Sequence, residues 1–284
     1  MKRTSRSEFD FVEGKCAGVA LHVQESGDQS ASYLMVFLHG GGVSGWMWDR
    51  QVKYFVHYHC MVPDLPGHGL SNDDIIFSIQ SSAEQLIQLI GEKAGGKKVV
   101  LVGFSLGAQV AVQMISLRPA LIDFAIINSA LVRPMPYAKK WIGPAVRLTF
   151  PLIKQRWFSR LQAKTLYLGD EYFERYYAES CRMPPDALIA VLEENMTFTI
   201  PAGFSEAAGK ILFTVGEKEK AVMKQSAKDL VAASSNCNGV IIPGIGHGVS
   251  LARPDFFNQM VDTWVHKGDV PKECKRFDVF FCSS

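Results

Sequence analysis

The sequence predicts an α/β fold in which helices flank a mostly parallel β-sheet. From residue 33 onward, short apolar runs alternate with longer helix-like segments, an order typical of parallel strands joined by helices. Tyr33 to Leu38 is an almost continuous apolar run, as expected for a strand buried on both faces of a parallel sheet. With 284 residues, 48% of them hydrophobic, the chain can form one large domain or a core with an insertion.

The expected elements follow one another in a regular order. An antiparallel pair of strands comes first, at residues 9–12 and 19–23. The later strands are expected at residues 33–38, 59–62, 98–102, 122–128, 210–215 and 238–242. The helices are expected at about residues 46–55, 82–93, 106–117, 220–233 and 251–266. Residues 268–284 have no clear periodicity, although 277–281 are apolar enough to dock on the sheet.

A long irregular stretch interrupts the alternation at residues 131–205. We expect it to be a helical insertion between the two parts of the core, residues 1–130 and 206–284. Its prolines are expected to divide it into several short helices, and they lie at positions 134, 136, 144, 151, 184, 185 and 201.

Charge is distributed unevenly within this insertion. Residues 131–164 include many basic side chains and no acidic one, whereas the charged side chains of residues 165–200 are mostly acidic. One interpretation is that the two halves are solvated helical faces that attract each other. The other is that the basic half contacts an anionic substrate or a lipid surface.

Composition argues against several classes of protein. The formal net charge of +2 gives no reason to expect a nucleic-acid partner. No apolar run reaches the roughly 18 residues of a membrane span. The basic N-terminus lacks an apolar stretch behind it, so we expect no secretory signal. The six cysteines lack metal-ligand or disulfide-framework spacing, Cys60 is expected to be a buried free thiol, and a reducing cytoplasm is the expected compartment.

The junction between the strand at 98–102 and the helix at 106–117 carries the motif Gly-x-Ser-x-Gly. Gly103 and Gly107 permit a sharp reversal of the chain, which projects the hydroxyl of Ser105 out of the sheet. In that position a base and a substrate can both reach the hydroxyl. The motif therefore predicts Ser105 as a nucleophile.

A serine nucleophile needs a base, and the base needs an orienting acid. His247 lies in a glycine-rich loop after the strand at 238–242, where flanking glycines constrain the backbone little. Two carboxylates, Glu217 and Glu219, follow the strand at 210–215. Either one would complete the chain order serine, acid, histidine.

These motifs, in this order, resemble the α/β-hydrolase family, and in particular its small capped esterases and lactonases. The resemblance spans residues 36–248 and implies a helical cap over the nucleophile at 131–205. It places the acid three residues after Gly216, at Glu219, with Glu217 as the alternative. The family usually has aspartate there, so the longer glutamate is a departure that changes the reach of the carboxylate.

The resemblance also implies an oxyanion hole, which stabilises the negative charge that develops during acyl transfer. The apolar strand at 33–38 opens into His39-Gly40-Gly41-Gly42, and the implied donors are the backbone N–H groups of Gly41 and Leu106. His39 is expected to brace this loop. Asp64 and His68, in a turn rich in proline and glycine, are expected to hold loop geometry.

We therefore expect hydrolysis of a small-molecule carboxylic ester or lactone through an acyl-serine, without a metal or an organic cofactor. Two alternatives stay open. The fold also serves ligand receptors and partner-binding proteins with little turnover, and carbon–carbon bond hydrolases and lyases use the same serine and histidine. The natural substrate and the oligomeric state are not predicted.

Overall fold

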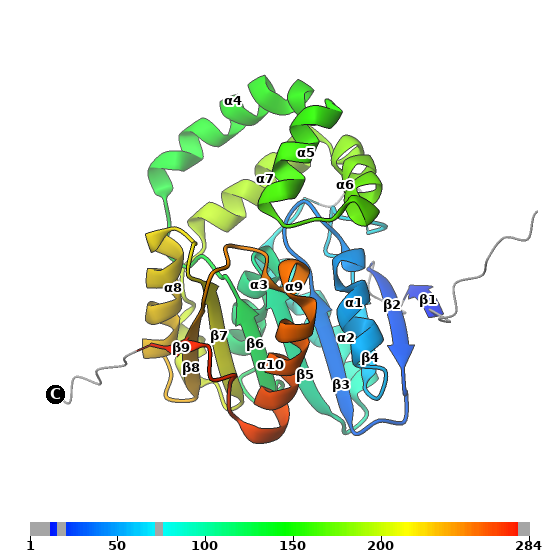
Figure 1. Ribbon diagram of the computed structural model, residues 1–284, viewed down its shortest axis with the longest axis vertical. Coiled ribbons are helices and arrows are strands. Elements are labelled where there is room, and N and C mark those ends of the chain that lie inside the picture. The colour runs from blue at the N-terminus through cyan, green and yellow to red at the C-terminus, as the bar shows by residue number, and fades with distance from the viewer. Residues whose placement is uncertain (1–11, 16–20, 72–75, 278–284) are drawn as a thin grey trace, which may run out of the picture.

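A computed structural model describes residues 12–15, 21–71 and 76–277, and these residues form one nine-stranded sheet. The strand order is β1-β2-β4-β3-β5-β6-β7-β8-β9 (Figure 1). All neighbouring pairs from β4 through β8 are parallel, whereas β1, β2 and β9 are antiparallel to their neighbours. The predicted fold class is therefore confirmed. The strands are β1 Val12–Lys15, β2 His22–Gly27, β3 Tyr33–Leu38, β4 His59–Pro63, β5 Lys98–Phe104, β6 Phe124–Asn128, β7 Lys210–Gly216, β8 Cys237–Ile242 and β9 Lys275–Arg276.

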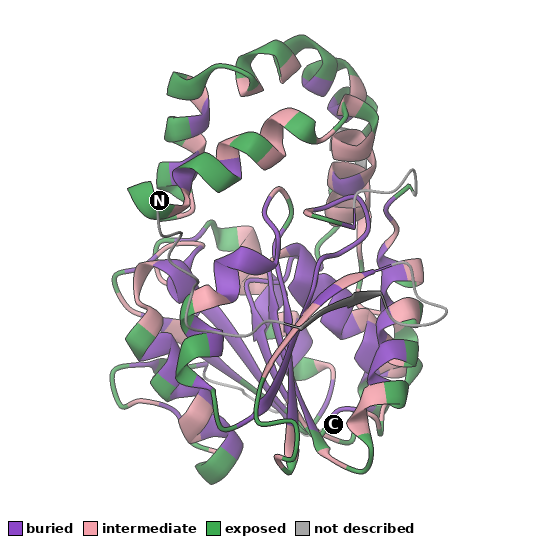
Figure 2. Cartoon of the chain, turned by 90° about the vertical axis from the view of Figure 1, so that its right-hand side faces the viewer, coloured by how far each residue is buried: buried purple, intermediate pink, exposed green. Residues whose placement is uncertain are grey.

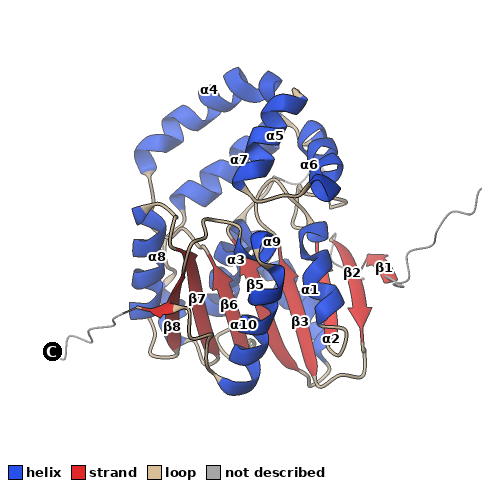
Figure 3. Ribbon diagram, viewed as in Figure 1, coloured by secondary structure: helices blue, strands red, loops and turns tan. Residues whose placement is uncertain are grey.

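Helices cover both faces of this sheet (Figure 3). Those that follow the predicted alternation are η1 Gly45–Trp48, α1 Asp49–Tyr54, α2 Ile79–Ala94, α3 Leu106–Leu117, α8 Ala221–Ala232, α9 Val249–Ala252 and α10 Pro254–Lys267, and the short η2 Ala202–Glu206, which was not predicted, precedes β7. The remaining four, between β6 and β7, are α4 Pro136–Ile153, α5 Arg156–Thr165, α6 Asp170–Arg182 and α7 Pro185–Thr197.

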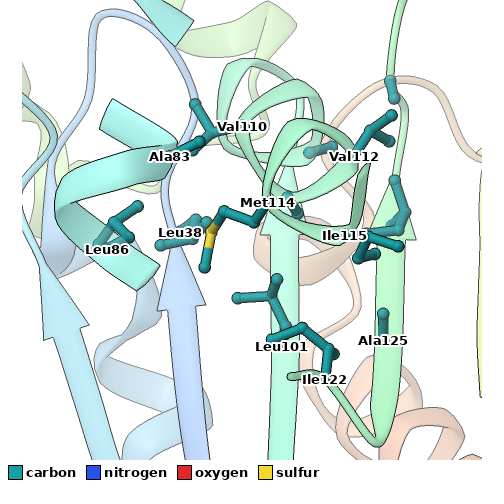
Figure 4. Close-up of a cluster of buried hydrophobic side chains, with 14 of the residues drawn as sticks. Leu38, Ala83, Leu86, Leu101, Val110, Val112, Met114, Ile115, Ile122 and Ala125 are labelled. Carbon is teal, nitrogen blue, oxygen red and sulfur yellow. The ribbon is translucent and has the colours of Figure 1, made fainter. Parts of the chain in front are cut away.

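The core has two layers because alternate side chains of each strand point to opposite faces. On β3, Leu34, Val36 and Leu38 belong to the layer that also contains residues of α2, α3 and α8, whereas Met35 and Phe37 belong to the layer that contains residues of α1 and α10. Figure 4 shows part of the first layer, where α2 and α3 pack on the central strands. Both layers are shielded from water, which explains the continuous apolar run in β3.

Two predicted boundaries at the sheet edges differ from the structure. The predicted strand at 9–12 lies outside the described residues except for Val12, which begins β1. The second predicted strand, 19–23, lies partly outside them too, and β2 continues to Gly27 because it pairs along that length with β4. At the other end, β9 pairs with β8 and Phe277 packs into the core; residues 278–281 lie outside the described part.

Two predictions about helices are wrong, and proline is involved in both. The single helix expected at 251–266 is two helices, α9 and α10, because the chain leaves helical geometry at Arg253 and restarts with Pro254 at the first helical position. In contrast, Pro144 and Pro151 do not end a helix: both lie inside α4. Each removes one backbone hydrogen bond, which α4 tolerates within an 18-residue helix.

The four helices α4 to α7, together with their flanking residues, are called the insertion below. They lie beyond the carboxyl ends of the parallel strands (Figure 1). In Figure 2 their residues are mostly exposed or intermediate, whereas the strands beneath are buried. None of the helices described here combines the length and apolarity needed to cross a bilayer.

The chain order places a switch point between β3 and β5. From β3 the chain moves to β4 on one side, and it then returns to β5 on the other side of β3. Loops at the carboxyl ends of two such strands diverge and leave a crevice, where open α/β sheets bind ligands. The loop after β3 and the turn after β5 are those that carry Gly41 and Ser105.

Candidate active site

Ser105 occupies the turn between β5 and α3 in a strained conformation, with φ 52° and ψ −110°. A non-glycine residue rarely adopts such a positive φ, and the turn closes tightly around it. A Cβ atom added at Gly103 would lie 2.7 Å from the carbonyl oxygen of Gly107, and one at Gly107 would collide with the backbone of Leu38. Both glycines are therefore required by close backbone approach.

His247 lies in the loop between β8 and α9, and its ring contacts the predicted nucleophile. Its Nε2 atom is 2.9 Å from Ser105 Oγ, and its Nδ1 atom is 2.8 Å from Glu219 Oε2. The carboxylate can only accept, so Nδ1 carries the proton and Nε2 accepts from the serine hydroxyl. The ring also packs against Phe104, with 4.9 Å between ring centroids.

Glu219 follows β7 and is almost completely buried. Its second oxygen, Oε1, accepts hydrogen bonds from Ser129 Oγ at 2.6 Å and from the Gly216 amide at 2.9 Å. Burial alone would raise the pKa of this carboxyl, but the contact with His247 and these hydrogen bonds outweigh burial and lower the pKa below its usual value. Glu219 is therefore held ionised beside the imidazole.

The alternative acid, Glu217, points elsewhere. Its carboxylate forms an ion pair with Lys275 at 2.6 Å and accepts from the Gly244 amide at 2.9 Å. The structure thus brings Ser105, His247 and Glu219 together and keeps Glu217 at the surface.

The glycine-rich loop after β3 is held by His39. The Nδ1 atom of this buried ring donates to the Gly40 carbonyl at 2.8 Å, and its Nε2 atom accepts from the Leu65 amide at 2.8 Å. Burial lowers the pKa of His39, so the ring stays neutral and can play both roles. The predicted bracing role is confirmed. Gly41 and Leu106 both line the cavity that contains Ser105.

The Asp64–Gly69 turn supports the same loop. Asp64 accepts from the Gly45 amide at 2.7 Å and from the Leu70 amide at 2.9 Å. His68 Nδ1 donates to the Pro66 carbonyl at 3.0 Å. These hydrogen bonds confirm that both side chains hold loop geometry. His68 also lines the cavity, a position that the sequence analysis did not predict.

The cavity has a volume of about 280 Å³ and lies between the core and the insertion. The core supplies the Ser105 hydroxyl and the glycine loops. The insertion supplies most of the remaining wall, with the apolar side chains Phe150, Ile153, Met183, Leu188, Val191 and Leu192 and the polar side chains Gln162, Glu179, Arg182 and Asn195. A mostly apolar wall with a few polar groups is typical of a small-molecule site.

Glu179 connects the insertion to the core and was not predicted from the sequence. Its carboxylate accepts from Ser44 Oγ at 2.8 Å and from Trp46 Nε1 at 2.9 Å. Trp46 in turn stacks on Tyr172, with 5.4 Å between ring centroids. Burial raises the pKa of Glu179. Ser129, the partner of Glu219, was missed as well; its position directly after β6 was the signal available in the sequence.

A metal ion would need several ligating side chains grouped together. Within residues 12–15, 21–71 and 76–277, no cluster of three or more His, Cys, Asp or Glu side chains is positioned to hold a metal ion.

Similar proteins were found by sequence and by structure. The sequence is 24% identical over 262 residues to an (E)-2-((N-methylformamido)methylene)succinate hydrolase from Acinetobacter baylyi, a match that covers 86% of this chain and 97% of that protein. It is 31% identical over 96 residues to an AB hydrolase superfamily protein from Gibberella zeae, but that match covers only 34% of the relative's length.

A solved structure of a thermophilic esterase from Thermogutta terrifontis superposes with a TM-score of 0.73, covering 91% of this chain and 98% of that one. At 17% sequence identity this likeness concerns the fold alone. Residues 35–260 match the model of the alpha/beta hydrolase family, which is most of the chain. The protein belongs to the alpha/beta hydrolase family.

Proposed function

We propose that the protein hydrolyses a small-molecule carboxylic ester or lactone through an acyl-serine intermediate. The observation that carries this proposal is the hydrogen-bonded series Ser105, His247 and Glu219, which ends at a cavity with a mostly apolar wall. The names of similar proteins, an esterase and a hydrolase, support the same reaction class.

In the proposed first step, Ser105 Oγ attacks the carbonyl carbon while its proton moves to His247 Nε2. The carbonyl oxygen becomes an oxyanion, which the N–H groups of Gly41 and Leu106 would stabilise. Collapse of this intermediate breaks the bond to the alkoxide oxygen, which takes the proton from His247. The alcohol leaves, or stays attached as the open chain of a lactone.

In the second step, His247 removes a proton from water, which attacks the acyl carbon. The second tetrahedral intermediate releases the carboxylic acid, and the proton on His247 returns to Ser105 Oγ. Glu219 keeps the proton of the neutral imidazole on Nδ1 and stabilises the cation that forms in each step. Because Ser129 and Gly216 occupy its other oxygen, the carboxylate is held in one orientation.

We propose further that residues 131–205 act as a cap on a core made of residues 1–130 and 206–284. Six apolar side chains of the insertion face the cavity, so the acyl or alcohol part of the substrate is expected to be apolar. A cytoplasmic location remains part of the proposal. It is supported by the described cysteines Cys60, Cys181, Cys237 and Cys274, which are all free thiols.

Intact mass after treatment with a fluorophosphonate tests the nucleophile, and a panel of p-nitrophenyl esters of increasing acyl length tests turnover. We expect one adduct on the wild-type protein and none on Ser105→Ala. Labelling without turnover of any ester would favour a receptor, or a carbon–carbon bond hydrolase or lyase. Absence of labelling in a folded protein would contradict the proposal.

A further inference from the structure

Helix α4 exposes an apolar face on the side away from the cavity. Tyr137 is 89% exposed, Trp141 72%, Leu148 81% and Leu152 38%. Their spacings of four, seven and four residues place all four on one side of the helix. Exposed apolar residues are ordinary when scattered singly, but a contiguous row marks an interaction surface.

The opposite side of α4 is apolar as well, and it is already occupied. Ile142 and Val146 are buried, while Phe150 and Ile153 line the cavity. The exposed row is therefore not needed to attach α4 to the rest of the protein. In Figure 1, α4 runs along the outer end of the insertion, farthest from the sheet.

Helix α5, which follows α4 in the chain, exposes apolar side chains too. Trp157 is 59% exposed and Leu161 is 54% exposed, and they lie four residues apart on one face of α5. We call these six side chains the outer face: Tyr137, Trp141, Leu148, Leu152, Trp157 and Leu161.

Positive charge accompanies the outer face. Residues 135–165 contain no aspartate or glutamate. Some of their basic residues, Lys139, Arg147, Arg156 and Arg160, form ion pairs with the acidic helices α6 and α7, so the attraction between the two halves of the insertion is confirmed for these. Among the described residues, Lys140, Lys154 and Lys164 have no such partner.

Two of these lysines lie where they can flank the outer face. Lys140 follows Tyr137 by three residues on α4, and Lys164 follows Trp157 by seven residues on α5. Lys154 differs, because its ammonium group lies over the ring of the cavity residue Phe150, 5.8 Å from the ring centroid. A lysine can lie along an apolar surface with its stem and extend its ammonium group toward a polar boundary.

We propose that the outer face binds an anionic lipid surface, with the aromatic and leucine side chains at the boundary between headgroups and acyl chains. Tryptophan and tyrosine favour this boundary, and lysines beside them attract anionic headgroups. A second copy of the chain fits less well, because two outer faces would bring like charges together.

The lipid contact does not depend on the proposed catalysis. Combined with it, the contact identifies a substrate class: esters that partition into a bilayer. This assignment of a substrate class rests on the proposed function and on one observation. Helix α4 carries both part of the outer face and the cavity residues Phe150 and Ile153.

Vesicle flotation of the full chain tests the contact, using phosphatidylcholine alone and phosphatidylcholine mixed with phosphatidylserine. We expect binding to the anionic vesicles, weaker binding to the neutral ones, and release by added salt. Tryptophan fluorescence gives a second readout. Trp46, Trp48 and Trp264 are already buried, so a blue shift on vesicle binding reports Trp141 and Trp157.

The variant Trp141→Ser with Leu148→Ser should lower the vesicle partition coefficient about tenfold or more, since it removes two large apolar side chains. The matched control is Ile76→Ser, a substitution of an 80%-exposed residue outside the insertion, which should bind as wild type. Lys140→Gln with Lys164→Gln should lower binding to anionic vesicles about tenfold, whereas the exposed pair Lys228→Gln with Lys272→Gln should change it much less.

Binding that the double variants leave unchanged would overturn the proposal. So would a wild-type protein that binds neither vesicle, or one that forms a dimer lost in Trp141→Ser with Leu148→Ser, which would assign the face to a second copy. Running flotation with Ser105→Ala separates the two proposals, because that variant should still bind vesicles. Turnover of a water-soluble short-chain ester should be unchanged in Trp141→Ser with Leu148→Ser.

Discussion

The core and the insertion meet at the same cavity but are built differently. In the core, Ser105 directly follows β5, whose residues after Lys98 are all buried, and His247 lies in the loop after β8, which is mostly buried. The insertion exposes much of its surface and reaches the core partly through polar contacts, such as Glu179 with Trp46 and Glu194 with the Ile79 amide at 2.7 Å. The difference suggests that the reacting atoms and the walls around them can be altered separately by mutation.

The largest expected effect belongs to the core. Ser105→Ala should reduce ester turnover by about 10⁴-fold or more, because it removes the atom that forms the acyl bond. The free energy of unfolding should change by less than about 1 kcal/mol, since alanine retains the small size that the turn needs. Steady-state kinetics and denaturant titration check both values. A folded variant with wild-type turnover would contradict the assignment.

The second prediction separates two neighbouring glutamates. Glu219→Gln should reduce turnover by about 10²-fold to 10⁴-fold, because the amide no longer stabilises the imidazolium. Glu217→Gln is the matched control and should stay within about twofold of wild type, because it removes only a surface ion pair with Lys275. The reverse ranking would move the acid to Glu217, and two neutral results would place it elsewhere.

The insertion should control selectivity instead of rate. Phe150→Ala shortens a side chain of the cavity wall and so enlarges the cavity, and the preferred acyl chain should become longer. The ratio of kcat/KM between esters that differ by one methylene should change by about 1–3 kcal/mol. Trp157→Ala, an aromatic truncation outside the cavity lining, is the control. A series of soluble p-nitrophenyl esters measures both. If Phe150→Ala leaves the optimum unmoved while fluorophosphonate labelling persists, α4 is not a specificity element.

A fourth prediction concerns pH and a buried histidine of the core. Burial, with the nearby His39, lowers the pKa of His68 to about 3. Between about pH 6.5 and pH 3 the unfolded chain binds a proton that the native His68 does not, so stability falls as pH falls, by up to about 1.4 kcal/mol per pH unit from this group.

Denaturant titrations at pH 7, 6 and 5 measure that dependence. His68→Asn should make the free energy of unfolding less dependent on pH in this range. His57→Asn, at an exposed position, is the matched control and should leave the slope as in wild type. Equal slopes for wild type and His68→Asn would show that His68 is not buried in its neutral form.

The smallest effect is expected on the outer face. Trp141→Ser and Leu148→Ser should each change the free energy of unfolding by about 0.5 kcal/mol or less, because both side chains are largely exposed. Leu101→Ala, in the buried layer between α3 and the sheet (Figure 4), should cost about 2–5 kcal/mol. If Trp141→Ser or Leu148→Ser lowered the free energy of unfolding as much as Leu101→Ala, the outer face would pack against the protein itself.

The sequence by itself determined the parts of the protein that depend on near neighbours along the chain. The apolar run of β3 predicted a central strand, and the glycines around Ser105 predicted the tight turn that the structure contains. His247 was located by its glycine-rich loop after a strand. These features can be read locally because backbone conformation and burial of a strand leave a pattern within a few residues.

Only the tertiary structure decided the features that join distant segments. The resemblance favoured Glu219 over Glu217, but only the fold shows that Glu219 contacts His247 while Glu217 pairs with Lys275. The partner of Glu219 is Ser129, the residue directly after β6, and the contact of Glu179 with Trp46 joins the insertion to the core. Helix α4 continues through two prolines that were expected to break it. The physical reason is that hydrogen bonds and packing depend on proximity in space. Residues that are far apart in the chain leave no pattern within a local stretch of sequence, and tertiary packing can override a local preference such as that of proline.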